Sequence, residues 1–249
     1  MRCRSVCLNL QLRQISSDMA MKNIIIVGAG DVDEKAWKAL WNESREKNAK
    51  QQEWILIAAD GGTDWLASYG IKQDYRIGDW DSAKEKPVSS KHTIVLPVKK
   101  DDTDLLAAIR LGMKQDGTVF HIFGSLGGER VDHSFASVQC LVFLKKHGCT
   151  GYIYHKQSVI TLMQDERMEF PDTMEGYFSV FAVSETVQQV TIKGAAYEVE
   201  DESFSIDYPI GVSNEFIGQK AEIMARDGML AIIYPQKNAE KVLRSQFQP

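Results

Sequence analysis

The chain has 249 residues, with apolar and charged fractions of 44% and 25%. These values are those of an ordinary globular protein and exclude a disordered chain. The formal net charge of −5 argues against a nucleic-acid partner, because the chain has no basic surplus to neutralise phosphates. No apolar run approaches the roughly 18 residues that a membrane span needs. We therefore expect one or two globular domains without membrane association.

The N-terminal segment, residues 1–20, is expected to be a disordered extension. Its apolar patch is too short for a secretory signal, and a buried strand begins just after Met21. The cysteines form neither a zinc-binding pattern nor a disulfide framework, so we expect free thiols in a reducing cytoplasm; they are Cys3, Cys7, Cys140 and Cys149.

Strands alternate with helices over residues 21–150. Short apolar runs predict strands at Asn23–Val27, Trp54–Ala59, Tyr75–Gly78, Thr93–Leu96 and Thr118–Phe123. Helical periodicity predicts helices at Val32–Asn48, Thr63–Tyr69, Thr103–Met113 and Asp132–His147. This alternation predicts an α/β domain with a mostly parallel sheet and helices on both faces. Ligands bind such sheets at the carboxyl ends of the strands.

The remaining residues, 151–249, show a different pattern. Short predicted strands follow one another without a helix, at Tyr152–His155, Val159–Met163, Tyr177–Val183, Thr186–Ile192, Ala195–Val199, Lys220–Met224 and Met229–Ile233. They predict a smaller antiparallel domain, a sandwich or a barrel. No Pro- or Gly-rich linker separates the two regions, so we expect them to pack tightly.

The first two loops of the α/β region with candidate site residues are Ala59–Gly62 and Gly78–Ser82. In the first, glycines at a strand-to-helix junction let the backbone approach a phosphate, although Asp-Gly also forms ordinary turns. In the second, Asp79 and Asp81 can reach one Mg²⁺ ion, or the loop is a solvated acidic turn, or Asp79 and Ser82 cap a helix. Gly28-Ala29-Gly30 is not a dinucleotide fingerprint, because its third glycine position holds Asp33.

The next two loops are Lys100–Asp104 and Gly124–His133. The first brings three acids and a lysine to a helix start, where Thr103 or Asp102 is also a good N-cap. The second is rich in glycine and ends with Arg130, Asp132 and His133. Arg130 is a planar donor suited to phosphate, unless it is only a surface charge and Asp132 is the N-cap of the helix. All four loops follow predicted strands, and together they suit a magnesium–triphosphate complex.

These motifs resemble those of the thiamine pyrophosphokinases in order and spacing. The resemblance covers nearly the whole chain from Met21 onward. The family pattern comprises A-D-G-G, G-D-F-D-S, K-D-x-T-D, G-G-R-x-D-H and a C-terminal S-N, represented here by Ala59–Gly62, Gly78–Ser82, Lys100–Asp104, Arg130–His133 and Ser213-Asn214. Trp80 replaces the usual Phe, and Glu129 is one extra residue before Arg130. The order of five motifs is specific even though each motif is common.

The resemblance implies transfer of a pyrophosphoryl group from ATP to thiamine. It implies an α/β ATP-binding catalytic domain, a β-sandwich thiamine-binding domain, and a homodimer with the site between subunits. The expected catalytic residues are Asp79, Asp81, Asp101, Asp104 and Arg130, with Mg²⁺ held by Asp79, Asp81 and Asp104. The expected ATP-binding residues are Asp60, Gly61, Gly62, Lys100, Thr103, Arg130, Asp132 and His133. Either Asp101 or Asp104 is expected to accept the hydroxyl proton.

Ser213, Asn214 and Phe216 are the expected thiamine contacts, although the burial tendency of aromatic residues favours a place in the core for Phe216. Three other functions remain open. The acceptor can be another hydroxyalkyl heterocycle such as a pterin, the protein can be a non-catalytic thiamine or nucleotide sensor, or it can be a metal-dependent phosphohydrolase. The intact acids at 79, 81 and 104 argue against a sensor.

Overall fold

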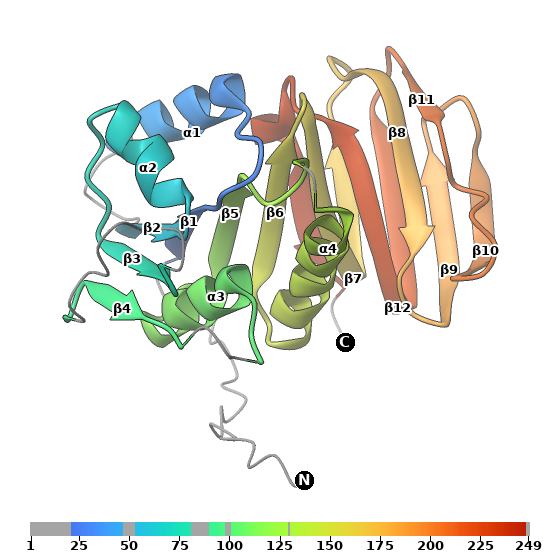
Figure 1. The fold of residues 1–249 in the computed structure, drawn as a ribbon. Coiled ribbons are helices and arrows are strands. Elements are labelled where there is room, and N and C mark those ends of the chain that lie inside the picture. Colours follow the sequence, from blue (N-terminus) through green and yellow to red (C-terminus); the bar gives the residue numbers. More distant parts are fainter. Residues whose placement is uncertain (1–20, 47–52, 81–89, 98–100, 129, 248–249) are drawn as a thin grey trace, which may run out of the picture.

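A computed structural model describes residues 21–46, 53–80, 90–97, 101–128 and 130–247 (Figure 1). The described strands form two regions, an α/β region and a β-rich region, which share one sheet of 13 strands. The expected N-terminal extension lies outside the described residues. No helix in the described ranges is long and apolar enough to span a membrane.

The α/β region has six parallel strands, in the spatial order β6-β5-β1-β2-β3-β4. They are β1 (Lys22–Val27), β2 (Glu53–Ala59), β3 (Tyr75–Gly78), β4 (Thr93–Val95), β5 (Val119–Phe123) and β6 (Thr150–His155). The four helices described in this region are α1 (Glu34–Glu46), α2 (Gly62–Ser68), α3 (Asp104–Lys114) and α4 (Val131–Lys146). The predicted parallel sheet is confirmed, and the predicted elements agree within a few residues.

Both faces of this sheet are covered by helices (Figure 1). On β1, Ile25 and Val27 face a core shared with Trp37 of α1 and Leu66 of α2. The alternate residues of β1 face a second core, which includes side chains of α3 and α4. Because successive strand residues point to opposite faces, a strand covered on both sides is apolar throughout. The predicted helices on both faces are therefore confirmed.

The β-rich region is built around two long antiparallel strands, β7 (Ser158–Phe170) and β12 (Ala221–Pro235), which pair along most of their length. Its other elements are β8 (Glu175–Ala182), β9 (Thr186–Lys193), β10 (Val199–Ser205), β11 (Asn214–Ile217), β13 (Leu243–Gln246) and a 3₁₀ helix, Ala239–Lys241. One half of β12 pairs with β9 and the other with β8. Residues of β7, β8, β9, β11 and β12 share one core, as expected of a β-sandwich.

The β-rich region departs from the predicted strands at several points. β7 extends to Phe170, beyond the predicted Val159–Met163, and β11 and β13 were not predicted. β6 is the last parallel strand and also pairs with β7, so the sheet is continuous across residue 150. The strands predicted at Lys220–Met224 and Met229–Ile233 form the single strand β12, with an irregular register between Ala225 and Met229. The prediction of a strand at Ala195–Val199 was wrong, since β10 begins at Val199. Gly194, at φ +72, turns the chain before that segment.

Candidate active site

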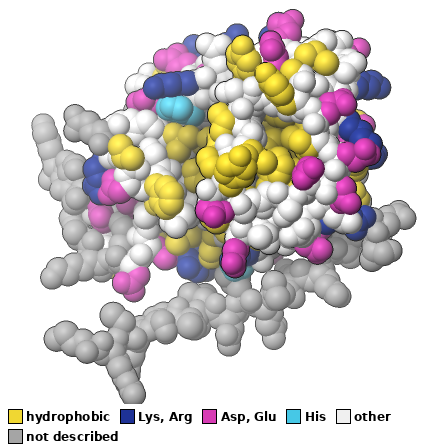
Figure 2. Space-filling model, turned by 90° about the vertical axis from the view of Figure 1, so that its right-hand side faces the viewer, with side chains coloured by type: hydrophobic (Ala, Val, Ile, Leu, Met, Phe, Trp, Pro, Cys, Tyr) yellow, Lys and Arg dark blue, Asp and Glu magenta, His cyan; other side chains and the backbone are white. Residues whose placement is uncertain are grey.

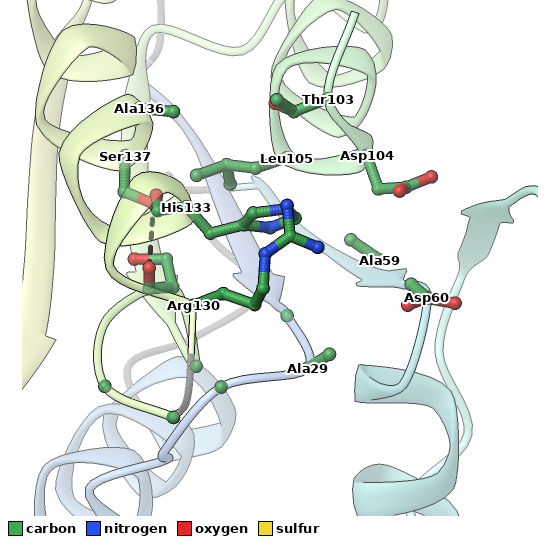
Figure 3. Close-up of a pocket in the computed structure, with 16 residues that line it drawn as sticks. Ala29, Ala59, Asp60, Thr103, Asp104, Leu105, Arg130, His133, Ala136 and Ser137 are labelled. Carbon is green, nitrogen blue, oxygen red and sulfur yellow. Dashed lines mark hydrogen bonds between the residues drawn. The ribbon is translucent and has the colours of Figure 1, made fainter. Parts of the chain in front are cut away.

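A pocket of about 280 Å³ lies at the carboxyl ends of β1 and β5, where the order of strands in the sheet reverses (Figure 3). The chain leaves β1 towards β2 on one side, and leaves β5 towards β6 on the other. A crevice at the carboxyl ends of such strands is the usual ligand site of an open parallel sheet. The lining residues are Gly28, Ala29, Gly30, Ala59, Asp60, Thr103, Asp104, Leu105, Gly124, Ser125, Gly127, Gly128, Arg130, His133, Ala136 and Ser137.

The floor of the pocket consists of two glycine-rich loops that are hydrogen-bonded to each other. The backbone N–H of Gly28 donates to Phe123 O at 2.8 Å, and that of Gly30 donates to Gly124 O at 2.7 Å. A Cβ on Gly28 would stand 2.6 Å from Gly124 O. Only glycine permits this approach of the loops after β1 and β5. The sequence analysis did not include Gly28–Gly30 in the site, and the adjacency of β1 and β5 is the signal that reveals them.

Asp60 and Asp104 line the same side of the pocket (Figure 3). Asp60 follows β2 in a left-handed conformation, at φ +48, and its N–H donates to Ile77 O of β3 at 2.9 Å. A Cβ on Gly78 would stand 3.3 Å from Asp60 Cα, so the ends of β2 and β3 are in contact. Asp79 follows at the end of β3 and is half-buried, but it is not one of the pocket-lining residues.

The three acids of the Lys100–Asp104 motif lie in different surroundings at the start of α3. Thr103 is the N-cap, and its Oγ1 accepts from Leu106 N at 3.2 Å. Asp102 pairs with Arg110 at 2.9 Å, while Asp101 is exposed and outside the pocket. Of these acids only Asp104 lines the pocket. The expected N-cap at this helix is therefore Thr103 rather than Asp102.

Arg130 and His133, at the start of α4, line the pocket between its two sides (Figure 3). Arg130 donates twice to Asp132, from Nε at 2.9 Å and from Nη2 at 2.6 Å. These hydrogen bonds lower the pKa of Asp132 to about 2, so its carboxylate is charged at neutral pH. Both side chains are exposed, so a phosphate can compete with Asp132 for the guanidinium. Asp132, Gly61 and Gly62 are not pocket-lining residues.

The donors of the pocket fit a magnesium ion. Asp60 and Asp104 supply carboxylate oxygens, which Mg²⁺ combines with phosphate oxygens and water. Within the described ranges, no three His, Cys, Asp or Glu side chains form a complete metal site. The predicted ligand Asp81 and the predicted phosphate contact Lys100 lie outside the described residues. A magnesium site here would therefore depend on phosphate oxygens as well as protein carboxylates.

Two family models match the chain. The thiamin pyrophosphokinase catalytic domain matches residues 47–153, and the thiamin pyrophosphokinase vitamin B1 binding domain matches residues 159–230. This chain belongs to the thiamin pyrophosphokinase family. The change of model falls between β6 and β7, where the parallel strands give way to the antiparallel ones.

One curated relative and several solved structures are similar to this chain. A thiamine pyrophosphokinase of Bacillus subtilis (strain 168) is 27% identical over 187 residues, which cover 72% of this chain and 86% of the relative. A crystal structure of the B. subtilis protein has a TM-score of 0.69 at 23% identity, covering 86% of this chain and 98% of that one. The thiamin pyrophosphokinase of Candida albicans has a TM-score of 0.64 at 14% identity, covering 90% and 95%. These structures share the fold of this chain.

The expected thiamine contacts lie in the region matched by the vitamin B1 binding model of the thiamin pyrophosphokinases. Asn214 is buried, and its Oδ1 accepts from the N–H groups of Tyr197 at 3.0 Å and Glu215 at 2.8 Å. Its Nδ2 donates to Tyr197 O at 2.6 Å. An Asn side chain has two amide hydrogens, so one donor remains for a ligand. The main role of the Asn214 side chain in this structure is therefore to fix the backbone at Tyr197.

The other two expected thiamine contacts differ from each other. Phe216 is buried and packs against Phe178 and Phe170, with ring centroids 4.6 and 5.3 Å apart. It belongs to the sandwich core. Ser213 is exposed in a left-handed conformation, at φ +59, and its N–H donates to Ser179 Oγ at 3.1 Å. Neither residue, nor Asn214, lines the pocket of its own chain.

Proposed function

We propose that this protein is a thiamine pyrophosphokinase that transfers the pyrophosphoryl group of ATP to the hydroxyethyl oxygen of thiamine. The products are thiamine diphosphate and AMP. The observation that carries the proposal is the meeting of Asp60, Asp104, Arg130 and two glycine loops in one pocket at the switch point of the sheet. The matches to the catalytic and vitamin B1 binding models of the family support the choice of acceptor.

The chemistry asks the protein mainly to position two substrates and to neutralise charge. A bound Mg²⁺ would neutralise the charge that develops on the phosphates. Asp60 and Asp104, together with Asp79 and Asp81, are the residues that would hold it. Arg130 is placed to bind phosphate oxygens once it leaves Asp132. The glycine loops let the substrate approach the backbone closely.

The transfer step requires a proton acceptor. The hydroxyl oxygen of thiamine forms a bond to the β-phosphorus, and the bond from that phosphorus to the bridging oxygen breaks, with AMP leaving on the opposite side. The hydroxyl proton passes to a carboxylate. Of the two acids proposed for this role, Asp104 lines the pocket and Asp101 does not. We therefore favour Asp104 as the acceptor.

The test is mass spectrometry after incubation of the protein with thiamine, ATP and Mg²⁺. Thiamine diphosphate and AMP are expected in equal amounts, and removal of Mg²⁺ by a chelator should stop their formation. Formation of AMP only with a hydroxymethyl pterin would show another acceptor. Phosphate release without an acceptor would show a phosphohydrolase, and binding without any product would show a sensor.

The surface of the β-rich region supports a homodimer. Hydrophobic side chains gather in the centre of the face over β8–β11, with charged residues around them (Figure 2). Large apolar side chains of β8, β11 and the loops flanking β10 are exposed, namely Tyr177, Tyr197, Ile206, Tyr208, Ile210, Val212 and Ile217. We call these residues the sandwich patch. A contiguous exposed apolar patch of this kind marks an interaction site.

A second copy of the chain is the proposed occupant of the sandwich patch. The catalytic pocket lies in the α/β region, whereas the vitamin B1 binding match lies in the sandwich, and Ser213 and Asn214 do not reach the pocket of their own chain. A partner subunit would bring its thiamine contacts to this pocket. The site would then be complete only in the dimer.

Charging the sandwich patch is expected to separate the subunits. The double substitution Ile206→Lys and Tyr208→Lys should give a monomer in sedimentation equilibrium and lower turnover at least tenfold, because charged groups are poorly tolerated in an apolar interface. Leu243→Lys is the matched control, since Leu243 is also exposed but belongs to β13. A wild-type protein that sediments as a fully active monomer would contradict the dimer.

Two left-handed glycines that line the pocket, Gly127 and Gly128, give a second prediction. A Cβ on Gly127, at φ +78, would stand 2.4 Å from Asp31 Oδ2, whereas one on Gly128, at φ +73, would meet no atom of the described residues within 4 Å. Both Ala variants carry about 1–2 kcal/mol of backbone strain. Gly127→Ala must also displace the loop, so kcat/KM should fall about tenfold further than in Gly128→Ala. Equal losses in the two variants would show that the Asp31 contact is unimportant.

A further inference from the structure

A second cavity, of about 290 Å³, lies between the end of α1, the start of β2 and the segment that leads into β3. It is as large as the catalytic pocket and large enough for a small molecule. The catalytic pocket lies at the carboxyl ends of the strands, whereas this cavity lies near the amino end of β2. None of the described residues that line it also lines the catalytic pocket. We call it the α1 cavity.

The floor of the α1 cavity is apolar and includes one aromatic ring. Ile25 of β1 and Leu56 of β2 are register partners, and both are buried in the core beneath α1. Trp54 lies on the same face of β2 as Leu56, because alternate residues of a strand point to one side. Its indole stacks on His121, with ring centroids 5.4 Å apart. This stack uses one face of the indole, so a planar ring can extend it on the other.

The end of α1 forms one wall of the α1 cavity. Trp41, Ser44 and Arg45 line it, and their spacing of three and four residues places them on one face of the helix. The guanidinium of Arg45 lies over the indole of Trp41, 5.4 Å from the ring centroid. Stacking uses the flat face of a guanidinium and leaves the N–H groups at its edge free to donate.

The opposite wall comes from the segment between α2 and β3, which contributes Lys72 and Asp74. Asp74 Oδ2 accepts from the backbone N–H of Leu56 at 2.8 Å, so this carboxylate already holds β2. Arg45 and Lys72 are exposed, and neither has an ion-pair partner among the described residues. Two cations and one engaged carboxylate give the rim of the cavity a positive balance.

The described lining residues favour a planar aromatic carboxylate. A ring can stack on Trp54 above the apolar floor, and the planar fork of Arg45 suits a carboxylate. An aromatic cation would be repelled by Arg45 and Lys72. We propose that the α1 cavity is a second ligand site, which binds a small aromatic carboxylate with its ring against Trp54 and its charge at Arg45 and Lys72. This site is separate from the one that carries the proposed function.

The test is isothermal titration with three probes that share one ring: naphthoate, which is an anion, naphthamide, which is neutral, and naphthylmethylammonium, which is a cation. Naphthoate should bind with a Kd of about 1 mM or tighter. It should bind about fivefold tighter than naphthamide, as expected for two exposed ion pairs, and the cation should bind most weakly. Saturating thiamine or Mg–ATP should change the affinity for naphthoate by less than about twofold.

Filling the α1 cavity should block the probes. Ser44→Leu places a larger side chain there, and leucine suits a helix at this half-buried position. It should weaken naphthoate and naphthamide at least about tenfold. Ala39→Leu is the matched control, because it adds the same side chain at an exposed position of α1 outside the cavity. This control should leave all three affinities unchanged.

Removing the two cations tests the ligand class. Arg45→Gln combined with Lys72→Gln should weaken naphthoate about fivefold and leave naphthamide within about twofold of the wild type. Lys35→Gln combined with Lys38→Gln is the matched control, since both lysines are exposed on α1 outside the cavity. Circular dichroism melting of each variant shows whether it is folded. If Ser44→Leu were unfolded, the paired glutamine variants would decide the question alone.

Four outcomes would overturn the proposal. A wild type that does not bind naphthoate has no such site. Displacement of naphthoate by thiamine or Mg–ATP would place the probe in the catalytic pocket, and unchanged binding in Ser44→Leu would place it elsewhere on the molecule. Equal affinity for the three probes would refute an anionic ligand. Formation of thiamine diphosphate does not depend on any of these results, so failure here is distinct from failure of the proposed function.

Discussion

Replacing Asp104 with asparagine is expected to lower kcat by about 10²–10³-fold, the size of loss seen when one charge-stabilising group is removed from an active site. Asp104 lines the pocket on the same side as Asp60. Asparagine keeps the shape of the side chain but removes the charge that would hold Mg²⁺ and the basicity that would accept a proton. The fold should survive, because Thr103 still caps α3 and a first-turn acid contributes only about 0.3–1 kcal/mol.

The measurement is steady-state formation of AMP with thiamine, ATP and Mg²⁺. Asp64→Asn is the matched control, because it removes the same charge from an exposed first-turn position of α2 outside the pocket. It should change kcat by less than about twofold, as expected of a screened surface charge. If Asp104→Asn kept turnover within tenfold of the wild type, Asp104 would be neither a ligand nor a base.

Asp101→Asn decides between the two acids considered for the proton. Asp101 is exposed and outside the pocket. Its variant should lose less than about tenfold in kcat, because a general base must come within hydrogen-bond reach of the proton it takes. A loss equal to that of Asp104→Asn would mean that Asp101 reaches the substrate in the assembled enzyme, and the roles of the two acids would be exchanged.

The α/β region could be predicted from sequence because its pattern is simple. β1 is apolar on both faces, and the helices between the strands have clear apolar stripes, so each element stands out. The β-rich region was harder. β10 exposes four consecutive residues, Glu200–Ser203, and only Phe204 is buried, so the strand has no alternating pattern. Its place at the edge of the sheet, which no local pattern reveals, explains this exposure.

The candidate site was predictable where charge marks it and not where backbone shape does. Asp60, Asp104, Arg130 and His133 all line one pocket, because each follows the carboxyl end of a strand or begins a helix there. Gly28–Gly30 escaped prediction because their part in the site depends on β5 lying beside β1. The hydrogen bonds between the side chain of Asn214 and the backbone of Tyr197 likewise join residues that are not neighbours in the sequence.

Replacing Glu166 with glutamine is expected to lower the free energy of unfolding by about 3–5 kcal/mol. Glu166 is buried, with a side-chain exposure of 2%. Arg244 of β13 donates to both of its carboxylate oxygens, from Nε to Oε2 at 3.0 Å and from Nη2 to Oε1 at 2.7 Å. Lys145, at the end of α4, donates to the same carboxylate. Without its charge, two half-buried cations, Lys145 and Arg244, face each other uncompensated. Urea denaturation at pH 7 measures the loss.

Glu169→Gln is the matched control on the same strand. Its partner Arg167 lies 3.6 Å away, and both side chains are well exposed, so the cost should stay below about 1 kcal/mol. A further substitution supports the electrostatic explanation: Lys145→Met, added to Glu166→Gln, should recover part of the stability by removing one of the unpaired cations. If Glu166→Gln were as stable as the wild type, the buried network would contribute nothing to folding.

The pH dependence of this effect follows from the pKa of Glu166. Burial alone would raise that pKa, but Arg244 and Lys145 outweigh it and hold the pKa below its ordinary value. A carboxyl whose pKa is lowered by folding stabilises the protein above its unfolded pKa, about 4.3, and loses that contribution as the pH falls towards its folded pKa. The difference between wild type and Glu166→Gln should therefore be full at pH 7 and shrink below about pH 4. Glu166 joins α4 to β13, because it accepts hydrogen bonds from Lys145 and Arg244. Amide hydrogen exchange in β13 should therefore be faster in Glu166→Gln than in the wild type, even at pH 7. Unchanged exchange would show that β13 is held by its pairing with β7 alone.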